Sequence, residues 1–387
     1  MQLVEEGRVE LDTPVVTYVP DFKLADPAAT AAITVRHLLA HTSGIPGDWF
    51  PELGEAATAA QYIATLADFE LAHPVGEHFD YSNAAFTLAG RLVEVITSKP
   101  WADVLAERIV GPLNLEMAAT GDPAGGLIVG LAMGHLPADP ASPLGASVPA
   151  PRYATHPESA SCGSTPVATA RSLAAFAQMF INDGQAPDGN EVLTAAAVKQ
   201  MAERQADVPP AGLDGWRTRG LGWGLGEWEG QQILQHRGGT LGQTSGLTVM
   251  PSRGVAVAIL TNGPGGFALC KAVEADLFSE VTGIAPPGPP QPPADPIRLD
   301  LSRYAGRYGS IGAEIDVKVE GQSLLAAVTP LMGLDPDQAP PAPPPVQLTP
   351  VDELTFAARD GSLLSFIAGD DGEPEYLFTG RLHRRQT

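Results

Sequence analysis

The chain has 387 residues, of which 44% are hydrophobic and 18% are charged, and this length predicts one large domain and one smaller domain. Its formal net charge of −22 at pH 7 disfavours nucleic acid and anionic lipid surfaces as partners, because both would repel it. No apolar run approaches the roughly 20 residues that a membrane-spanning helix needs, so we expect no membrane span.

The first segment, "MQLVEEG", has the features of a helix end. Met1, Leu3 and Val4 are apolar, and Gly7 stands where a left-handed residue often closes a helix. No N-cap residue precedes Met1, and a helix this short does not nucleate in water. We therefore interpret the segment as the end of a longer helix whose start lies upstream.

Two histidines follow in "HLLAH", where His37 and His41 are four residues apart and could share one face of a helix. Zinc peptidases place two histidines in this way, but they carry a glutamate after the first histidine, where this chain has Leu38. We therefore expect no metal site here. Instead, we expect both histidines to fix the turn "HTSGIPG" by hydrogen bonds.

Two amphipathic segments predict core helices. In "NAAFTLAGRLVEVIT" the apolar stripe consists of Phe86, Ala89, Leu92, Val93 and Ile96. In "ARSLAAFAQMFINDG" it consists of Leu173, Phe176, Ala177 and Phe180.

Three strand-like runs follow, "QILQHRGG", "GLTVM" and "GVAVAIL", of which the last two are joined by the turn "PSRG". A helix is predicted after them, from Phe267 to about Val281. Antiparallel strands next to helices indicate an α+β fold, in which helices flank an antiparallel sheet.

The segment "APPGPPQPPADP", residues 285–296, divides the chain, because its prolines exclude a helix or a central strand. We expect one domain over residues 1–284 and a second over residues 297–387. The second reads as all-β, with short alternating runs such as "EIDVKVEG" and "SLLSFIAG". A further proline cluster at residues 339–345 is expected to be a surface loop between strands.

Two short segments combine polar residues with a helix start or with glycines. In "DYSNAAF", Tyr81, Ser82 and Asn83 stand at the mouth of a predicted helix, where such residues usually act as caps. In "HRGGTLG", a strand reaches His236 and is followed by glycines, which allow a backbone to approach a ligand closely. Cys162 and Cys270 have no spacing typical of a disulfide framework or a zinc site, so we expect two small buried side chains.

Taken together, these motifs resemble the serine hydrolases of the β-lactamase and penicillin-binding-protein superfamily. The resemblance is greatest to its class C-like branch of esterases, D-stereospecific peptidases and β-lactamase-related proteins. It covers nearly all of residues 1–284 and rests on "GRVELDTPVVTYVPDF", "ITVRHLLAHTSGIP", "YSNAAFTLAGRLVE", "GLGWGL" and "HRGGTLG". The tail, with "YAGRY", is similar to the lipocalin-like barrels that follow many of these enzymes.

The resemblance implies roles for five residues. Tyr81 would be a proton-relaying phenol, Asn83 an amide that orients the substrate, and His236 the start of the third family motif. Gly238 would bind the substrate, and Gly239 would offer a backbone N–H to the oxyanion of an acyl-transfer intermediate. No cofactor or metal is implied, and the partner would be a small-molecule or peptide substrate.

The first family motif, Ser-x-x-Lys, does not occur in the printed chain. The residues three positions before its lysines (Lys23, Lys99, Lys199, Lys271 and Lys318) are Pro20, Ile96, Ala196, Ala268 and Ile315. In related sequences the nucleophile begins the helix that ends as "MQLVEEG". We therefore expect an N-terminally truncated sequence that is inactive and poorly stable, with an exposed edge of the sheet.

Three alternatives remain open for the function. The chain could represent an acyl-serine esterase or peptidase, or a catalytically dead protein that binds peptides or cell-wall fragments. A different nucleophile, such as Ser43 or Ser164, is disfavoured because the chain contains no Gly-x-Ser-x-Gly. A neutral His236 favours esters or amides over β-lactams, and Arg237 would face the other side of its strand.

Overall fold

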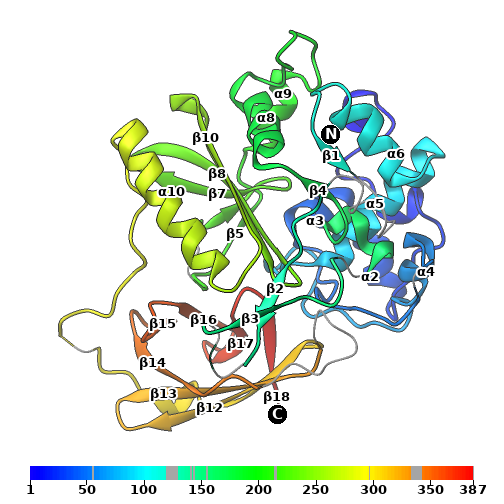
Figure 1. Cartoon of the computed structure of the whole chain (residues 1–387). Helices are drawn as coiled ribbons and strands as arrows, with labels where there is room; N and C mark the ends of the chain where they lie inside the picture. Colours follow the sequence, from blue (N-terminus) through cyan, green and yellow to red (C-terminus); the bar gives the residue numbers. More distant parts are fainter. Residues whose placement is uncertain are drawn as a thin grey trace.

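The computed structural model describes residues 1–54, 56–118, 130–139, 142, 144–153, 156–212, 216–295, 297–332 and 342–386. A helical region and a large sheet form the upper part of the molecule in Figure 1, and the C-terminal strands form a separate body beneath them. Within these ranges, no helix has both the length and the apolar character needed to cross a bilayer.

The large sheet is antiparallel, with the strand order β10-β9-β8-β7-β6-β5. Its strands are β5 (Ala206–Asp207), β6 (Thr218–Arg219), β7 (Gly224–Trp228), β8 (Gln231–Thr240), β9 (Gln243–Met250) and β10 (Val255–Thr261). The predicted turn "PSRG" joins β9 to β10 through the 3₁₀ turn η4 (Pro251–Arg253) and Gly254, whose φ is +65°. All three predicted strand runs are therefore confirmed.

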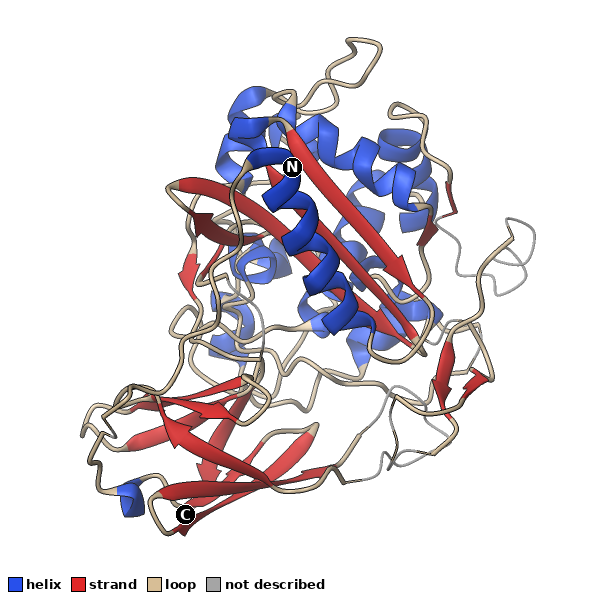
Figure 2. Ribbon diagram, turned by 60° about the vertical axis from the view of Figure 1, so that its left-hand side comes forward, coloured by secondary structure: helices blue, strands red, loops and turns tan. Residues whose placement is uncertain are grey.

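Helices cover both faces of this sheet, as Figure 2 shows. Leu234 and Val249 pack in one core cluster with α8 (Ala170–Ile181), whereas Ile233 and Met250 pack in another with α10 (Gly266–Thr282). Neighbouring residues of a strand point to opposite faces, so this division follows from the alternation of each strand. The predicted α+β sandwich is confirmed.

The helical region surrounds α5 (Asn83–Thr97), which matches the predicted helix residue for residue. Its most buried apolar side chains are Ala84, Ala85, Leu88 and Leu92. The predicted stripe lies at the edge of that face, because Ala89, Val93 and Ile96 are only partly buried against the same core.

Shorter elements complete this region. They are α1 (Gln2–Glu5), η1 (Val15–Thr17), α2 (Pro27–Ala32), α3 (Val35–Ala40), α4 (Ala59–Ala64), α6 (Trp101–Leu105), η2 (Ala106–Val110), η3 (Pro157–Cys162) and α9 (Ala195–Met201). Two small antiparallel pairs are β1 (Met117–Ala118) with β4 (Val167–Ala168) and β2 (His135–Pro137) with β3 (Ser147–Pro149).

The predicted all-β tail is a closed barrel in which β11 pairs with both β12 and β18. After η5 (Leu301–Arg303), its strands are β11 (Gly306–Gly309), β12 (Ala313–Glu320), β13 (Ser323–Pro330), β14 (Val346–Pro350), β15 (Thr355–Ala358), β16 (Leu363–Ala368), β17 (Pro374–Phe378) and β18 (Leu382–Gln386). The loop between β13 and β14 contains the second proline cluster, of which residues 339–341 lie outside the described part.

Aromatic side chains fill the inside of this barrel. Phe366 packs against Tyr304, Tyr308 and Phe356 with ring centroids 4.9, 5.6 and 5.3 Å apart. All four side chains are almost completely buried. Because aromatic pairs at these spacings leave no room for a ligand between them, the barrel interior is a packed core.

Between the two bodies, residues 284–295 form neither helix nor strand.

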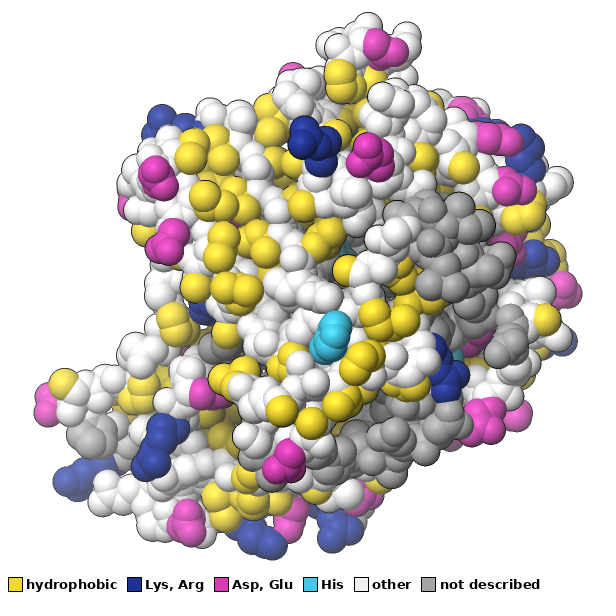
Figure 3. All heavy atoms as spheres, in the orientation of Figure 1, with side chains coloured by type: hydrophobic (Ala, Val, Ile, Leu, Met, Phe, Trp, Pro, Cys, Tyr) yellow, Lys and Arg dark blue, Asp and Glu magenta, His cyan; other side chains and the backbone are white. Residues whose placement is uncertain are grey.

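The exposed side of α10 carries Phe267, Leu269, Leu277 and Val281, and Figure 3 shows hydrophobic atoms over this part of the molecule.

The barrel contacts the helical region through the turn between β17 and β18. The Arg381 guanidinium forms an ion pair with Asp48 at 2.8 Å, and the Leu382 N–H donates to Asp80 Oδ1 at 3.1 Å. Phe378 of β17 meets Phe79 edge to face, with centroids 6.0 Å apart. Burial raises the pKa of Asp80 to about 7, although Arg381 and the Leu382 N–H both oppose that change.

We predict that Asp80→Asn stabilises the protein at alkaline pH. The pKa of Asp80 is raised on folding, so the native state prefers its neutral form, and its stability falls as the pH rises from about 4 towards 7. Asparagine stays neutral and keeps an acceptor for the Leu382 N–H. Urea unfolding should show a gain of about 1 to 3 kcal/mol at pH 8 and little gain at pH 4.

The control for this prediction is Asp12→Asn, which removes an exposed carboxylate that is paired with Arg36. It should not stabilise the protein at either pH. Equal or lower stability of Asp80→Asn at pH 8 would contradict the prediction.

Candidate active site

Tyr81 immediately precedes the capped start of α5. Ser82 has an extended backbone, and its Oγ accepts a hydrogen bond from the Ala85 N–H at 3.0 Å, as an N-cap does. Asn83 is the first residue of the helix, and its Nδ2 donates to Asp48 Oδ1 at 3.1 Å. Asp48 therefore holds Asn83 and Arg381 of the barrel at the same point.

Three side chains surround the Tyr81 ring. The imidazole of His41 stacks on it, with centroids 4.2 Å apart and an interplanar angle of 26°. The guanidinium carbons of Arg381 and Arg219 lie 4.6 and 5.7 Å from its centroid, within the range of cation–π contacts. Burial raises the pKa of Tyr81, and the charges of Arg219 and Arg381 act in the opposite direction.

His41 ends α3 in a left-handed conformation, with φ of +56°, and is completely enclosed. Its Nδ1 accepts a hydrogen bond from the Ser82 N–H at 3.0 Å. Desolvation, assisted by Arg219, lowers its pKa well below the ordinary value, so the ring is neutral. His41 therefore holds the start of α5, and the prediction that its ring fixes the turn after it was wrong.

His37 has a different role, because its Nδ1 accepts from the Thr34 N–H and completes the N-terminal cap of α3. Its ring therefore also bonds outside the turn "HTSGIPG". The two histidines of "HLLAH" thus act in separate hydrogen-bond networks.

His236 lies across from Tyr81 on β8, with ring centroids 6.5 Å apart. Burial and the charge of Arg219 lower its pKa to about 4, so the imidazole is neutral near pH 7. Arg237 points to the other face of the sheet and forms an ion pair with Glu274 of α10 at 2.7 Å. The prediction that His236 and Arg237 face opposite sides of their strand is confirmed.

The hairpin of β8 and β9 controls the direction of the Gly239 N–H. Thr240 and Gln243 close a two-residue turn, so they exchange hydrogen bonds, and the next pair, Gly239 with Thr244, does not. The Gly239 N–H therefore points away from β9. On that side β7 pairs with β8 only as far as Gln235, so no strand in the described ranges covers Gly239.

Neighbouring side chains lie close to both glycines of this segment. A Cβ atom at Gly238 would lie 2.7 Å from Ser245 Oγ, and one at Gly239 would lie 3.2 Å from the Phe267 ring. The structure thus brings Tyr81 and Asn83, at the start of α5, close to His236 of β8. The Gly239 N–H lies on the same strand, where none of the described strands covers it.

Sequence reasoning missed three charged residues at this site: Asp48, Arg219 and Arg381. Asp48 and Arg219 flank quoted family segments, and Arg381 belongs to the basic tail "RLHRR". No local pattern could have identified them, because each meets Tyr81 or Asn83 only through tertiary contacts.

The two serines considered as alternative nucleophiles have structural hydrogen bonds. Ser43 is fully buried, and its Oγ accepts from the Ile45 N–H at 3.3 Å. Ser164 Oγ donates to the His156 carbonyl at 2.8 Å.

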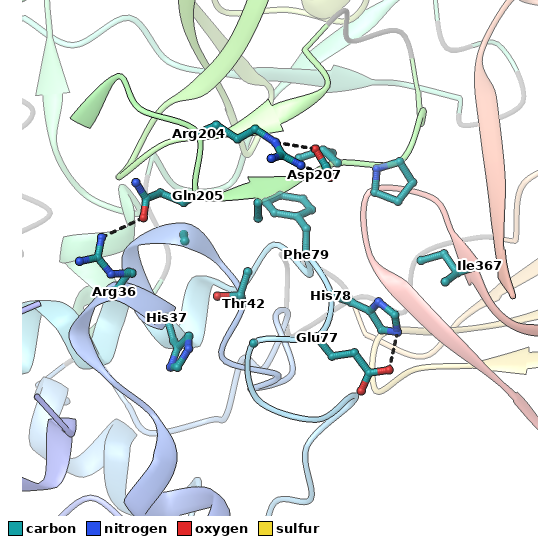
Figure 4. Close-up of a pocket in the computed structure, with 15 residues that line it drawn as sticks. Arg36, His37, Thr42, Glu77, His78, Phe79, Arg204, Gln205, Asp207 and Ile367 are labelled. Carbon is teal, nitrogen blue, oxygen red and sulfur yellow. Dashed lines mark hydrogen bonds and ion pairs between the residues drawn. The ribbon is translucent and has the colours of Figure 1, made fainter. Parts of the chain in front are cut away.

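Two cavities are found in the described part of the molecule, one near Phe79 and one on the opposite face of the sheet from His236. One of about 550 Å³ is lined by residues that include His37, His78 and Phe79, and Figure 4 shows Arg204 and Asp207 paired with each other on one side of it. The other, of about 590 Å³, lies between Trp228 and the proline-rich segment. Neither is lined by Tyr81 or His236, whose side chains pack closely around Arg219.

Comparisons with known proteins agree with this fold. The family model described as Beta-lactamase matches residues 1–277. Penicillin-binding protein 4 of Amycolatopsis lactamdurans is 35% identical over 314 residues, which are 80% of this chain and 80% of that protein.

Solved structures show the same architecture. The crystal structure of SurE has a TM-score of 0.77 at 22% identity and covers 100% of this chain and 84% of that chain. A D-stereospecific amidohydrolase from Streptomyces sp. has a TM-score of 0.56 at 23% identity and covers 73% and 82% of the two chains. With the family match and the related sequence, this establishes that the chain belongs to the Beta-lactamase family.

Proposed function

We propose that this protein is a serine hydrolase of this family that acts by acyl-enzyme chemistry on an ester, an amide or a D-amino-acid peptide. The observation that supports this most strongly is the approach of Tyr81 and His236 to 6.5 Å from distant parts of the sequence. Asn83 lies beside Tyr81 and is held by Asp48. These residues match the family's second and third motifs in their order along the chain.

Each residue has a distinct role in this proposal. The Tyr81 hydroxyl relays a proton between the nucleophile and the leaving group. Asn83 orients the acyl group, and Gly238, two residues after His236 on β8, contacts the substrate. The Gly239 N–H donates to the oxyanion, since it points away from β9 at an uncovered edge of β8.

The nucleophile is not supplied by residues 1–387 in the Ser-x-x-Lys form. We therefore expect this chain to bind substrates without turning them over. The same observation favours a second candidate function, a catalytically dead protein that binds peptides or cell-wall fragments. Both functions would use one groove, namely the partly exposed surface between Tyr81 and His236. They differ in whether a nucleophile is present.

The proposed substrate class draws on related folds and on the charge of His236. Structures of similar fold include D-amino acid amidase from Ochrobactrum anthropi SV3 with D-phenylalanine and SurE with D-Leu. A neutral His236 offers no permanent cation to the carboxylate of a β-lactam. We therefore favour esters and amides of D-amino acids.

This proposal predicts that the chain binds its substrate without hydrolysing it. Calorimetric titration of the 387-residue chain with D-phenylalanine amide should give a saturable isotherm, and chromatography should detect no hydrolysis. Tyr81→Ala should weaken binding about tenfold, which corresponds to about 1.4 kcal/mol, because it removes the ring that lines the groove. Arg204→Ala, an exposed change in a neighbouring cavity, should leave the affinity unchanged.

If the unchanged chain hydrolysed D-phenylalanine amide and Tyr81→Phe did not, the expected lack of turnover would be contradicted. Equal affinities of Tyr81→Ala and the unchanged protein would contradict the location of the groove.

The second prediction concerns the charge at position 236. Because the pKa of His236 is lowered to about 4, this residue should contribute no change in D-phenylalanine amide affinity between pH 6 and 8. His236→Lys introduces a cation and should increase the affinity for benzylpenicillin about tenfold relative to the amide. His236→Gln is the matched neutral control and should not increase the affinity for benzylpenicillin. If the ratio of benzylpenicillin affinity to D-phenylalanine amide affinity were the same in His236→Lys and His236→Gln, this prediction would be wrong.

A further inference from the structure

The cavity of about 590 Å³ lies on the face of the large sheet that α10 covers. Gln235 and Arg237 of β8 line it, and they alternate with His236, so their side chains point to the face opposite that histidine. Residues 286–290, which follow α10, form another part of its wall. Its volume is typical of a site for a small molecule, for which roughly 300 to 1,000 Å³ is usual.

The wall of this cavity reverses the charge balance of the chain. In the whole sequence, 45 acidic residues outnumber 23 lysines and arginines. The cavity wall instead has more cations than carboxylates, and these charged residues are Arg204, Arg217, Arg237, Lys271, Glu227 and Glu274. A concave surface lined by one sign of charge focuses the electric field, so this cavity attracts anions.

Arg237 is held at the cavity wall by a buried ion pair. Its Nη2 donates to Glu274 Oε2 at 2.7 Å, and the two side chains are only 14% and 5% exposed. Gln235 Nε2 and Thr248 Oγ1 donate to the other oxygen of Glu274 at 3.0 and 2.8 Å. Burying such a pair costs desolvation energy, but it fixes the guanidinium in one orientation. The cation is therefore preorganised for a ligand.

Two further cations reach the same cavity from other elements. Arg217 comes just before β6, and Lys271 belongs to α10. Arg204 lies in an exposed position and is paired with Asp207, so we assign it no part in binding. Positive charge thus converges on the cavity from β8, α10 and the start of β6.

The rest of the wall includes apolar surface. Trp228 of β7 contributes its indole, and four of the five residues at 286–290 are prolines. Proline has no backbone N–H, so this part of the wall presents rings rather than backbone donors. A ligand with an apolar body and a negative group would therefore match both kinds of surface.

We propose that this cavity is a second binding site, which takes a small organic anion. Arg217, Arg237 and Lys271 bind its carboxylate or phosphate, and its apolar body lies against Trp228 and residues 286–290. Neither Tyr81 nor a nucleophile takes part, so this inference goes beyond the proposed function and does not rest on it.

The first experiment follows the indole N–H signal of Trp228 by NMR in the 387-residue chain, with Trp228→Phe used only to assign it. Benzoate and phenyl phosphate should shift this signal in a saturable way, and the tighter of the two identifies the preferred anionic group. Benzyl alcohol has the same ring without a charge, and it should cause no shift at the same concentrations. No response to either anion, or an equal response to benzyl alcohol, would overturn the proposal.

The second experiment removes one cation and measures the affinity for the tighter anion by calorimetry. Lys271→Gln should weaken binding about fivefold, and Lys271→Arg should keep most of the affinity, because it retains the charge. Lys271 is the better choice for this test, since loss of Arg237 would leave the buried Glu274 without its cation.

Two control variants locate the effect. Lys318→Gln changes the net charge of the chain equally, at an exposed position of the barrel beside Asp316, and it should leave the affinity unchanged. Leu269→Ser alters the exposed apolar side of α10 and should also leave it unchanged.

Equal affinities of Lys271→Gln and Lys318→Gln would overturn the proposal, as would a loss in Leu269→Ser as large as that in Lys271→Gln. If Lys271→Gln does not fold, the comparison of charged and uncharged ligands still decides the question in the unchanged chain. None of these measurements uses D-phenylalanine amide. Failure of this inference is therefore distinguishable from failure of the proposed function.

Discussion

The hydrogen bond from the Ser82 N–H to His41 Nδ1 is the interaction on which the site depends. It joins the end of α3 to the start of α5, and it places the neutral His41 ring against Tyr81. It also fixes the proton of His41 on Nε2, and so determines how Arg219 meets this ring. This contact thus joins the N-cap residue of α5, the stacked pair of His41 and Tyr81, and Arg219 in one cluster.

The barrel contributes to the same cluster, although its interior is closed by aromatic side chains. Arg381 reaches Tyr81 and Asp48 from the turn between β17 and β18. Asp80, next to Tyr81 in sequence, accepts the Leu382 N–H. The protonation state of Asp80 therefore affects both the contact of the barrel with the helical region and the electrostatic environment of Tyr81.

The sequence predicted those parts of the molecule that depend on local periodicity. The helix over residues 83–97, the alternation of His236 and Arg237, and the strands of the tail all follow from patterns within a few residues. The contacts of Arg219 with His41 and of Arg381 with Asp48 join segments far apart in the chain. No local pattern encodes such pairs, so Tyr81 and His236 could be named from motifs, whereas the cations around them could not.

The account is tested most directly by a crystal structure of the 387-residue chain soaked with D-phenylalanine amide. It predicts the ligand between Tyr81 and the edge of β8, with its carbonyl oxygen accepting a hydrogen bond from the Gly239 N–H. A ligand seated instead in the cavity beside His78 or in the cavity beside Trp228, with the Tyr81 groove empty, would contradict it.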